Sequence, residues 1–165
     1  KELDAEVLKE AFGNVTSPGR LEVVRTAPTV VVDAAHNPDG IRVSSEAIQE
    51  AFSFSKLVVV VGVLREKDAE EILKTLKESL GGLAEEFCFT QSNSARAVPA
   101  AELAELAVDL GFGEDNVHIA EKLDDALEWA VERAESNDDL AGGVLVTGSI
   151  TVVAEARILL GKASA

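Results

Sequence analysis

Short runs rich in valine and isoleucine alternate with segments whose apolar residues recur at helical spacing, and this alternation constrains the fold more than any other feature. We expect strands over residues 21–26, 29–32, 56–61, 86–90, 117–120 and 144–147. We expect helices over residues 3–12, 38–52, 68–80, 99–111 and 123–135, and a closing helix that ends near Gly161. Such strand-helix-strand repeats predict an α/β fold, namely a Rossmann-like, doubly wound, mostly parallel sheet of about six strands.

The first two expected strands must pair differently from the others. Only Ala27 and Pro28 separate them, and a parallel pair would need a crossover of a dozen or more residues. We therefore predict one antiparallel edge strand. The 165 residues of the chain suffice for one hydrophobic core, so we expect a single domain over residues 1–165.

Open sheets of this type bind ligands beyond the carboxyl ends of their strands. In this chain, several polar residues fall in the loops expected at that edge, and they are Asp33, His36, Asn37, Arg65, Lys67, Asp68, Thr90, Arg96, Thr147 and Ser149. Three of them are cations in a chain whose formal net charge is -15. We expect the edge to suit an anionic ligand despite the acidic surface elsewhere.

Two of these loops carry polar groups at the start of an expected helix. In residues 33–38, Asn37 is placed to cap the helix, Asp33 adds a carboxylate, and His36 adds an imidazole whose neutral form is favoured at a helix N-terminus. In residues 147–149, Ser149 and free backbone N–H groups suit a carboxylate or phosphoryl oxygen. Helix capping alone would also explain Asn37 and Ser149, so both interpretations stay open.

Composition and missing motifs argue against several other functions. The acid excess repels nucleic acid and anionic lipid, and no run approaches the roughly 18 apolar residues of a membrane span. The sequence has no G-x-G-x-x-G motif for a dinucleotide, no G-x-x-x-x-G-K-[ST] phosphate loop and no G-x-S-x-G elbow for a serine nucleophile. Two histidines and one cysteine cannot form a structural zinc site, and we predict no metal site. We expect the lone Cys88 to be buried in a cytoplasmic protein.

Two motifs resemble those of a known family. Residues 17–22 read SPGRLE, and residues 33–40 read DAAHNPDG. With the SARA loop at residues 94–97 and TGS at residues 147–149, they resemble the C-terminal domain of folylpolyglutamate synthases and dihydrofolate synthases, which belong to the Mur ligase superfamily. The resemblance extends from about residue 16 to residue 161. It weakens at residues 150–153, where ITVV stands in place of a run that often contains leucine and tyrosine.

The resemblance implies an ATP-dependent ligase. In this family a folate carboxylate, of tetrahydrofolate or dihydropteroate, is phosphorylated, and the amine of L-glutamate attacks the acyl phosphate. Arg20 would reach the ATP phosphates and stabilise the transferred phosphoryl group, and Asp33 and Asn37 would contact the nucleotide. His36, which would also be catalytic, and Ser149 would lie near the glutamate or the phosphoryl group.

The chain contains no Met and begins with Lys1 inside an expected helix. We therefore expect a C-terminal domain of a longer enzyme, inactive alone. In the resembled family an N-terminal P-loop domain holds the phosphate loop, the Mg²⁺ ligands and a modified lysine, so it would bind most of the ATP and Mg²⁺ and be the partner of this domain. Two alternatives remain: the corresponding domain of a cell-wall Mur-type amino-acid ligase, and a non-catalytic stand-alone binding module of the same fold.

Overall fold

A computed structural model of the chain describes residues 21–26, 28–80, 82–135 and 142–161. Within these residues, one sheet contains the strands β1 (Glu22–Thr26), β2 (Thr29–Val32), β3 (Lys56–Val61), β4 (Ala84–Phe89), β5 (Val117–Ile119) and β6 (Gly142–Thr147). The described helices are α2 (Pro38–Ala51), α3 (Ala69–Ser79), α4 (Ala100–Asp109), α5 (Leu123–Glu135) and α6 (Ile150–Leu159), with a short 3₁₀ helix, η2 (Glu114–Asn116). The helix expected over residues 3–12 lies outside the described residues.

The sheet has the strand order β1-β2-β6-β3-β4-β5. The pairs β2–β6, β6–β3, β3–β4 and β4–β5 are parallel, and β1 pairs with β2 in antiparallel register at the edge. These findings confirm the predicted fold class and the antiparallel edge strand. They add that β6, the last strand in the chain, lies in the interior of the sheet, with Val144 beside Val30 of β2 and Val58 of β3.

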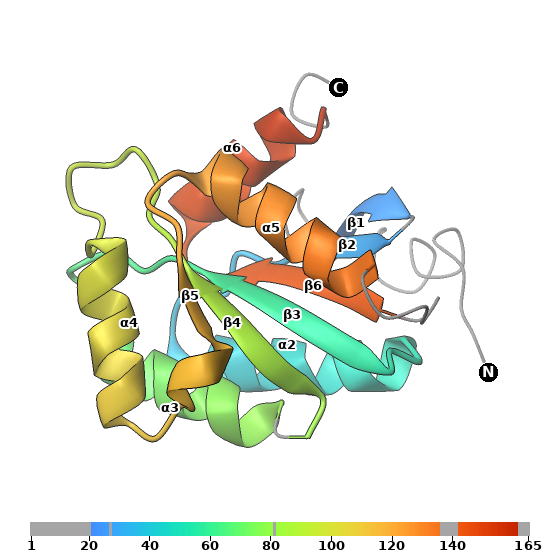
Figure 1. Cartoon of the computed structure of the whole chain (residues 1–165), viewed down its shortest axis with the longest axis horizontal. Coiled ribbons are helices and arrows are strands. Elements are labelled where there is room, and N and C mark those ends of the chain that lie inside the picture. Colours follow the sequence, from blue (N-terminus) through green and yellow to red (C-terminus); the bar gives the residue numbers. More distant parts are fainter. Residues whose placement is uncertain (1–20, 27, 81, 136–141, 162–165) are drawn as a thin grey trace.

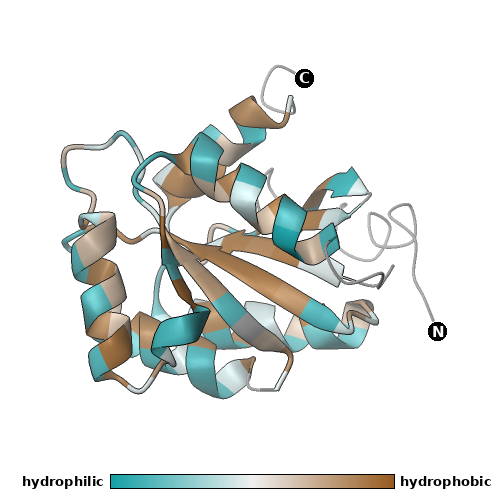
Figure 2. Ribbon diagram, viewed as in Figure 1, coloured by the Kyte–Doolittle hydropathy of each residue, from teal (hydrophilic) through white to brown (hydrophobic). Residues whose placement is uncertain are grey.

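Helices cover both faces of the sheet, so the structure has three layers, with the sheet in the middle (Figure 1). Helices α2, α3 and α4 pack on one face with Val59 and Val61, whereas α5 and α6 pack on the other face with Val58 and Val60. Because successive residues of a strand point to opposite faces, a strand covered on both sides needs an unbroken apolar run. Figure 2 shows this as continuous hydrophobic colour along the central strands.

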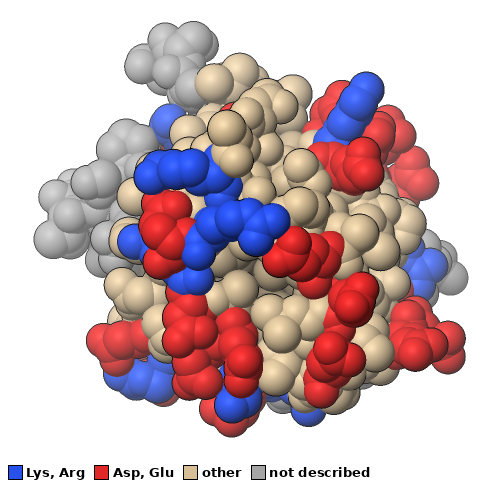
Figure 3. All heavy atoms as spheres, turned by 90° about the vertical axis from the view of Figure 1, so that its left-hand side faces the viewer, with Lys and Arg blue, Asp and Glu red and all other residues tan. Residues whose placement is uncertain are grey.

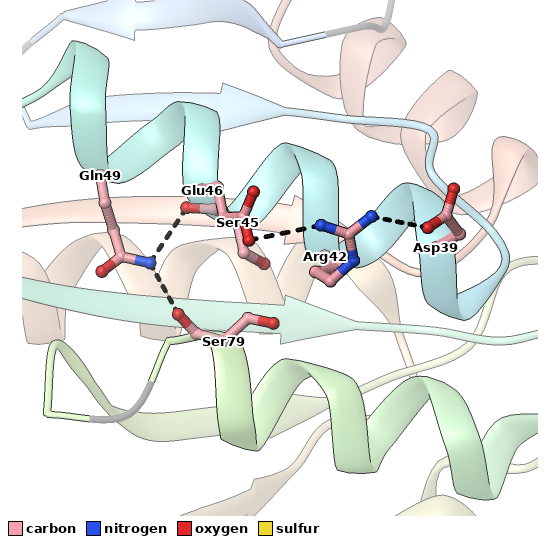
Figure 4. Close-up of polar contacts among 6 residues, drawn as sticks. All are labelled: Asp39, Arg42, Ser45, Glu46, Gln49 and Ser79. Carbon is pink, nitrogen blue, oxygen red and sulfur yellow. Dashed lines mark hydrogen bonds and ion pairs between the residues drawn. The ribbon is translucent and has the colours of Figure 1, made fainter.

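Polar side chains cap the N-termini of three helices. Asn37, Asp68 and Ser149 are the N-caps of α2, α3 and α6, and each side chain accepts a hydrogen bond from a backbone N–H in the first turn, at 2.8, 3.2 and 3.2 Å. These caps satisfy N–H groups that have no partner inside the helix. On the outer side of α2, Gln49 Nε2 donates to the Ser79 carbonyl at the end of α3, which ties the two helices together (Figure 4).

A buried carboxylate lies near the amino ends of β3 and β4. Glu86 is 8% exposed, its Oε1 lies 2.7 Å from Nζ of Lys56, and its Oε2 accepts from Nε of Arg133 on α5 at 2.9 Å. Burial alone would raise the pKa of Glu86, but the hydrogen bonds from Lys56 and Arg133 outweigh it and hold the pKa below its usual value. The group is therefore ionised at neutral pH and joins β3, β4 and α5.

Replacing Glu86 with glutamine removes this charge, and we expect the free energy of unfolding at neutral pH to fall by about 1–3 kcal/mol. A carboxylate with a lowered folded-state pKa stabilises the fold above its unfolded pKa, which is about 4.3. That contribution is lost as the pH falls through the folded-state pKa. Urea unfolding should thus show the gap between wild type and E86Q shrinking as the pH falls below about 4.3.

The matched control is Glu128→Gln, which changes an exposed residue of α5, the helix that carries Arg133. It should shift the stability little at either pH. A gap between wild type and E86Q that is the same in acid and at neutral pH would contradict the assignment.

Candidate functional site

The insertion of β6 between β2 and β3 creates a switch point in the sheet. The chain leaves β2 toward α2 on one face, and it leaves the neighbouring β6 toward α6 on the opposite face. The connections diverge at this point, so a crevice is expected beyond the carboxyl ends of the two strands. The DAAHNP turn follows β2 and the TGS turn follows β6, so the fold brings both motifs to the same edge of the sheet, at neighbouring strands.

Asp33 anchors the turn after β2. It is 1% exposed, and its backbone N–H donates to the Val146 carbonyl of β6 at 3.0 Å. Its Oδ1 accepts from the Leu21 N–H at 3.0 Å, and its Oδ2 accepts from the Ala35 N–H at 3.2 Å and from Oγ of Ser44 at 2.5 Å. A buried carboxylate is stable only when such donors surround it. Asp33 thus links β1, the turn and α2.

Leu21, the residue after Arg20, has a left-handed backbone. Its φ is +46°, which is uncommon for a residue with a side chain. The hydrogen bond from its N–H to Asp33 holds this conformation. On the other side of β1, Glu22 Oε1 accepts from Nε of Arg157 on α6 at 2.7 Å. Arg20 itself lies outside the described residues, but the chain that follows it is fixed to the buried carboxylate and to α6.

His36 and Asn37 lie at the start of α2. His36 Nδ1 is 2.9 Å from the Ala34 carbonyl, and because a carbonyl only accepts, Nδ1 carries the hydrogen. In the neutral ring this leaves Nε2 as an acceptor. Asn37 is exposed and uses its Oδ1 for the helix cap, which leaves its amide N–H₂ as a donor pointing away from that bond. The turn therefore presents one acceptor and one donor beyond the carboxyl end of β2.

Ser149 lies at the start of α6, directly after a glycine that the geometry requires. Gly148 has φ +110°, and a Cβ atom there would come within 2.4 Å of the Gly62 carbonyl oxygen. Any side chain at residue 148 would be strained and would push β3 and β6 apart. The tight turn places Ser149 at 1% exposure, where its Oγ accepts from the Val152 N–H. The capping interpretation of Ser149 is therefore confirmed.

The loops after β3 and β4 join each other and carry the predicted cations. Leu64 forms a bridge with Ala97, and the Arg65 N–H donates to the Arg96 carbonyl at 2.8 Å. Figure 3 views the end of the molecule at which these strands finish, and it shows basic side chains gathered there with acidic side chains around them. Arg65 pairs with Glu102 at 3.0 Å, and Arg96 pairs with Glu66 at 2.9 Å. Both guanidinium groups are thus partly neutralised.

The remaining polar groups of the site differ in how well they are satisfied. Thr90, at the carboxyl end of β4, is fully buried, and its hydroxyl has no hydrogen-bond partner among the described residues. Cys88 is buried as predicted, and burial raises the pKa of its thiol to about 12, so it is not a nucleophile at neutral pH.

In the part of the chain that the structure describes, no three His, Cys, Asp or Glu side chains are grouped to hold a metal ion. None of the described helices could cross a membrane.

Several polar residues of the site are not candidates from their sequence pattern alone. Ser44 is one of them, although its position between Ile41 and Ile48 at helical spacing could have marked it, because a hydroxyl on a buried stripe needs a partner. Ser92, Thr151 and Glu155 are the others, and they connect the loop after β4 to α6. No local signal reveals them, since each bond joins residues about 60 positions apart.

Comparisons with known proteins agree with this architecture. The family described as Mur ligase, glutamate ligase domain matches residues 19–150. The chain is 39% identical to a dihydrofolate synthase/folylpolyglutamate synthase of Mycobacterium tuberculosis, over 98% of this chain and 34% of that protein. A crystal structure of Mycobacterium tuberculosis folylpolyglutamate synthase complexed with ADP and AMPPCP superposes with a TM-score of 0.81 and 39% identity, over 96% of this chain and 36% of that one.

A cell-wall enzyme is also similar. The chain is 28% identical to a UDP-N-acetylmuramoyl-L-alanyl-D-glutamate--2,6-diaminopimelate ligase of Caldanaerobacter subterraneus, over 79% of this chain and 27% of that protein. The family match covers most of the chain, so the chain belongs to the Mur ligase family as a glutamate ligase domain. It spans about a third of the length of the folylpolyglutamate synthases that it resembles.

The role of Ser44 in holding Asp33 can be tested by Ser44→Ala. The substitution removes a 2.5 Å hydrogen bond to a buried carboxylate, and we expect the free energy of unfolding to fall by about 1–3 kcal/mol. Ser45→Ala is the control, because Ser45 is equally buried on α2 but its hydroxyl makes no hydrogen bond with another described residue. Equal stabilities of the two variants in urea unfolding would show that the Ser44 bond contributes nothing.

Proposed function

We propose that this chain is the C-terminal, glutamate ligase domain of an ATP-dependent enzyme that joins L-glutamate to a folate carboxylate through an acyl phosphate. The observation that carries the proposal is that the DAAHNP turn and the TGS turn follow neighbouring parallel strands and lie at the same edge of the sheet. The similarity to folylpolyglutamate synthases, one of them in complex with ADP and AMPPCP, supports it.

In the first step, the folate carboxylate takes the γ-phosphoryl group of ATP, and ADP leaves. A developing negative charge on the transferred group must be stabilised, and Arg20 is our candidate for this. Asp33 and Asn37 are proposed to contact the nucleotide. The amide N–H₂ of Asn37 is a donor for an oxygen. The Asp33 carboxylate is buried and already accepts from Leu21, Ala35 and Ser44, so its contact with a hydroxyl group such as those of a ribose would use a remaining lone pair.

In the second step, the amine of glutamate attacks the carbonyl carbon of the acyl phosphate, phosphate leaves, and the nitrogen loses a proton. His36 suits this step, because its Nδ1–H bond to the Ala34 carbonyl leaves Nε2 ready to accept a proton or hydrogen bond from the amine. Ser149 and the first N–H groups of α6 suit a carboxylate or phosphoryl oxygen.

We further propose that the chain supplies only part of the active site. It contains no phosphate loop and spans about a third of its relatives. An N-terminal P-loop domain would bind most of the ATP together with Mg²⁺, which would neutralise charge on the phosphates, and the isolated chain would be inactive. Folate is preferred over a cell-wall precursor because the identity to the folate enzyme is 39% over 98% of the chain, against 28% over 79% for the cell-wall ligase.

Single substitutions in the full-length protein test the site. We expect Arg20→Ala and His36→Ala each to lower the rate of glutamate addition to a folate about 100-fold or more, because each removes a group that acts on the reacting atoms. The rate is measured as amide formation at saturating ATP, glutamate and folate. Arg42→Ala and His118→Ala are the matched controls. Arg42 pairs with Asp39 and Glu46 on the exposed side of α2 (Figure 4). His118 lies on β5, where its ring stacks on Trp129 of α5.

Near wild-type turnover of both R20A and H36A would overturn the site assignment. A wild-type protein that extends a nucleotide-linked peptide precursor rather than a folate would favour the cell-wall alternative. Titration calorimetry of the isolated chain with ATP and with glutamate addresses the third possibility. Weak or absent binding fits a half-site, and tight binding would favour a stand-alone binding module.

A further inference from the structure

A chain of three hydroxyl groups leads from the loop after β4 to the first turn of α6. Ser92 Oγ lies 3.0 Å from Thr151 Oγ1, which lies 3.3 Å from Ser149 Oγ. Ser92 and Ser149 are 4% and 1% exposed, and Thr151 is half-buried. Close by, the Asn93 N–H donates to both carboxylate oxygens of Glu155, at 2.9 and 3.2 Å. The loop is therefore fastened to α6 at two adjacent points.

The direction of these hydrogen bonds follows from the number of protons available. A hydroxyl group has one proton, and the Thr151 hydroxyl donates it to Ser92. Ser149 must therefore donate its own proton to Thr151, while it accepts from the Val152 N–H. In this arrangement Ser149 has no proton left for a ligand.

An anionic ligand at Ser149 requires the opposite direction. A carboxylate or phosphoryl oxygen only accepts, so Ser149 must turn its proton toward the ligand. Thr151 can then donate to Ser149, because either hydroxyl can be the donor of that bond. Ser92, whose oxygen accepts from Thr151 in the present arrangement, must adjust its side chain to donate in return. Hydrogen bonds that follow one direction along a chain polarise and strengthen one another. The reversed chain would thus make Ser149 a better donor than a single serine.

The unpaired hydroxyl of Thr90 supports a polar ligand on this side. Alternation along β4 puts Thr90 on the same face of the sheet as Cys88, which packs in one cluster with Val152 and Val153 of α6. A buried hydroxyl without a partner is costly, and a bound polar group or water would relieve that cost. The unpaired Thr90 hydroxyl therefore lies on the face of the sheet that α6 covers.

We propose that Ser92 and Thr151 are positioning residues for glutamate addition: they hold Ser149 and reverse their hydrogen bonds when an anionic oxygen of the glutamate binds to it. This inference rests on the proposed function. If the three hydroxyl groups had only a structural role, they would stabilise the loop and α6 without a preference for any one substrate. The two roles therefore predict different effects on the KM for glutamate and the KM for ATP.

The test uses the full-length protein with Thr151→Val, which keeps the shape of the side chain but removes the hydroxyl. We expect the KM for glutamate to rise about 3- to 10-fold, the loss of one hydrogen bond, with the KM for ATP unchanged and kcat changed less. Thr151→Ser restores a hydroxyl and should restore the KM. Ser92→Ala should raise the KM for glutamate in the same way by a smaller factor.

Thr75→Val is the control for the substitution itself, because Thr75 Oγ1 bonds only to the Glu71 carbonyl on the outside of α3. Equal KM values for T151V and wild type, or equal KM values for T151V and T151S, would overturn the positioning role. So would a rise in the KM for ATP that matches the rise for glutamate. A wild-type protein that does not add glutamate to folate would instead refute the proposed function, and the two failures are therefore distinguishable.

Discussion

The pairing of β6 with both β2 and β3 is the interaction on which the rest of the structure depends. Without it, β1 and β2 would have no hydrogen bonds to the other strands, since β2 contacts the sheet through β6. Because β6 follows the other described strands in sequence, the sheet is complete only when residues 142–147 have joined it, and the contacts that complete it connect distant residues. The same insertion sends α2 and α6 to opposite faces and so creates the switch point at the ends of β2 and β6.

At this switch point, hydrogen bonds between buried polar groups hold the elements together, whereas apolar contacts hold them elsewhere. The Asp33 carboxylate gathers donors from Leu21, Ala35 and Ser44, and the Ser92, Thr151 and Ser149 hydroxyls join a loop to α6. Such networks are rigid when every member is satisfied, because a lost partner leaves a costly buried group. Rigid turns hold the DAAHNP and TGS motifs in place, as the proposed positioning of substrates would require.

Much of this arrangement was predictable from local pattern. Continuous apolar runs predicted the central strands, and Asn37, Asp68 and Ser149 predicted the helix starts, because a strand buried on both faces and an uncapped N-terminus each demand particular residues nearby. The prediction of the strand ends was less accurate. β4 begins at Ala84 and β6 at Gly142, two residues earlier than expected in each case. Glycine and acidic residues at those ends conceal backbone pairing from a hydropathy pattern. The motifs for Asp33, His36 and Asn37 were also recognisable, and Arg20 lies outside the described residues.

The sequence by itself determined which segments are strands and helices, where three helices begin, and which family the motifs resemble, because these depend on neighbouring residues. Only the tertiary structure decided the position of β6, the partners of Asp33, and the hydroxyl chain from Ser92 to Ser149, because each depends on contacts between residues far apart in the chain. Gly148 depends on both levels. The glycine itself is visible in the sequence, but the reason for it is tertiary, because a Cβ atom there would lie 2.4 Å from the carbonyl oxygen of Gly62, the residue after β3.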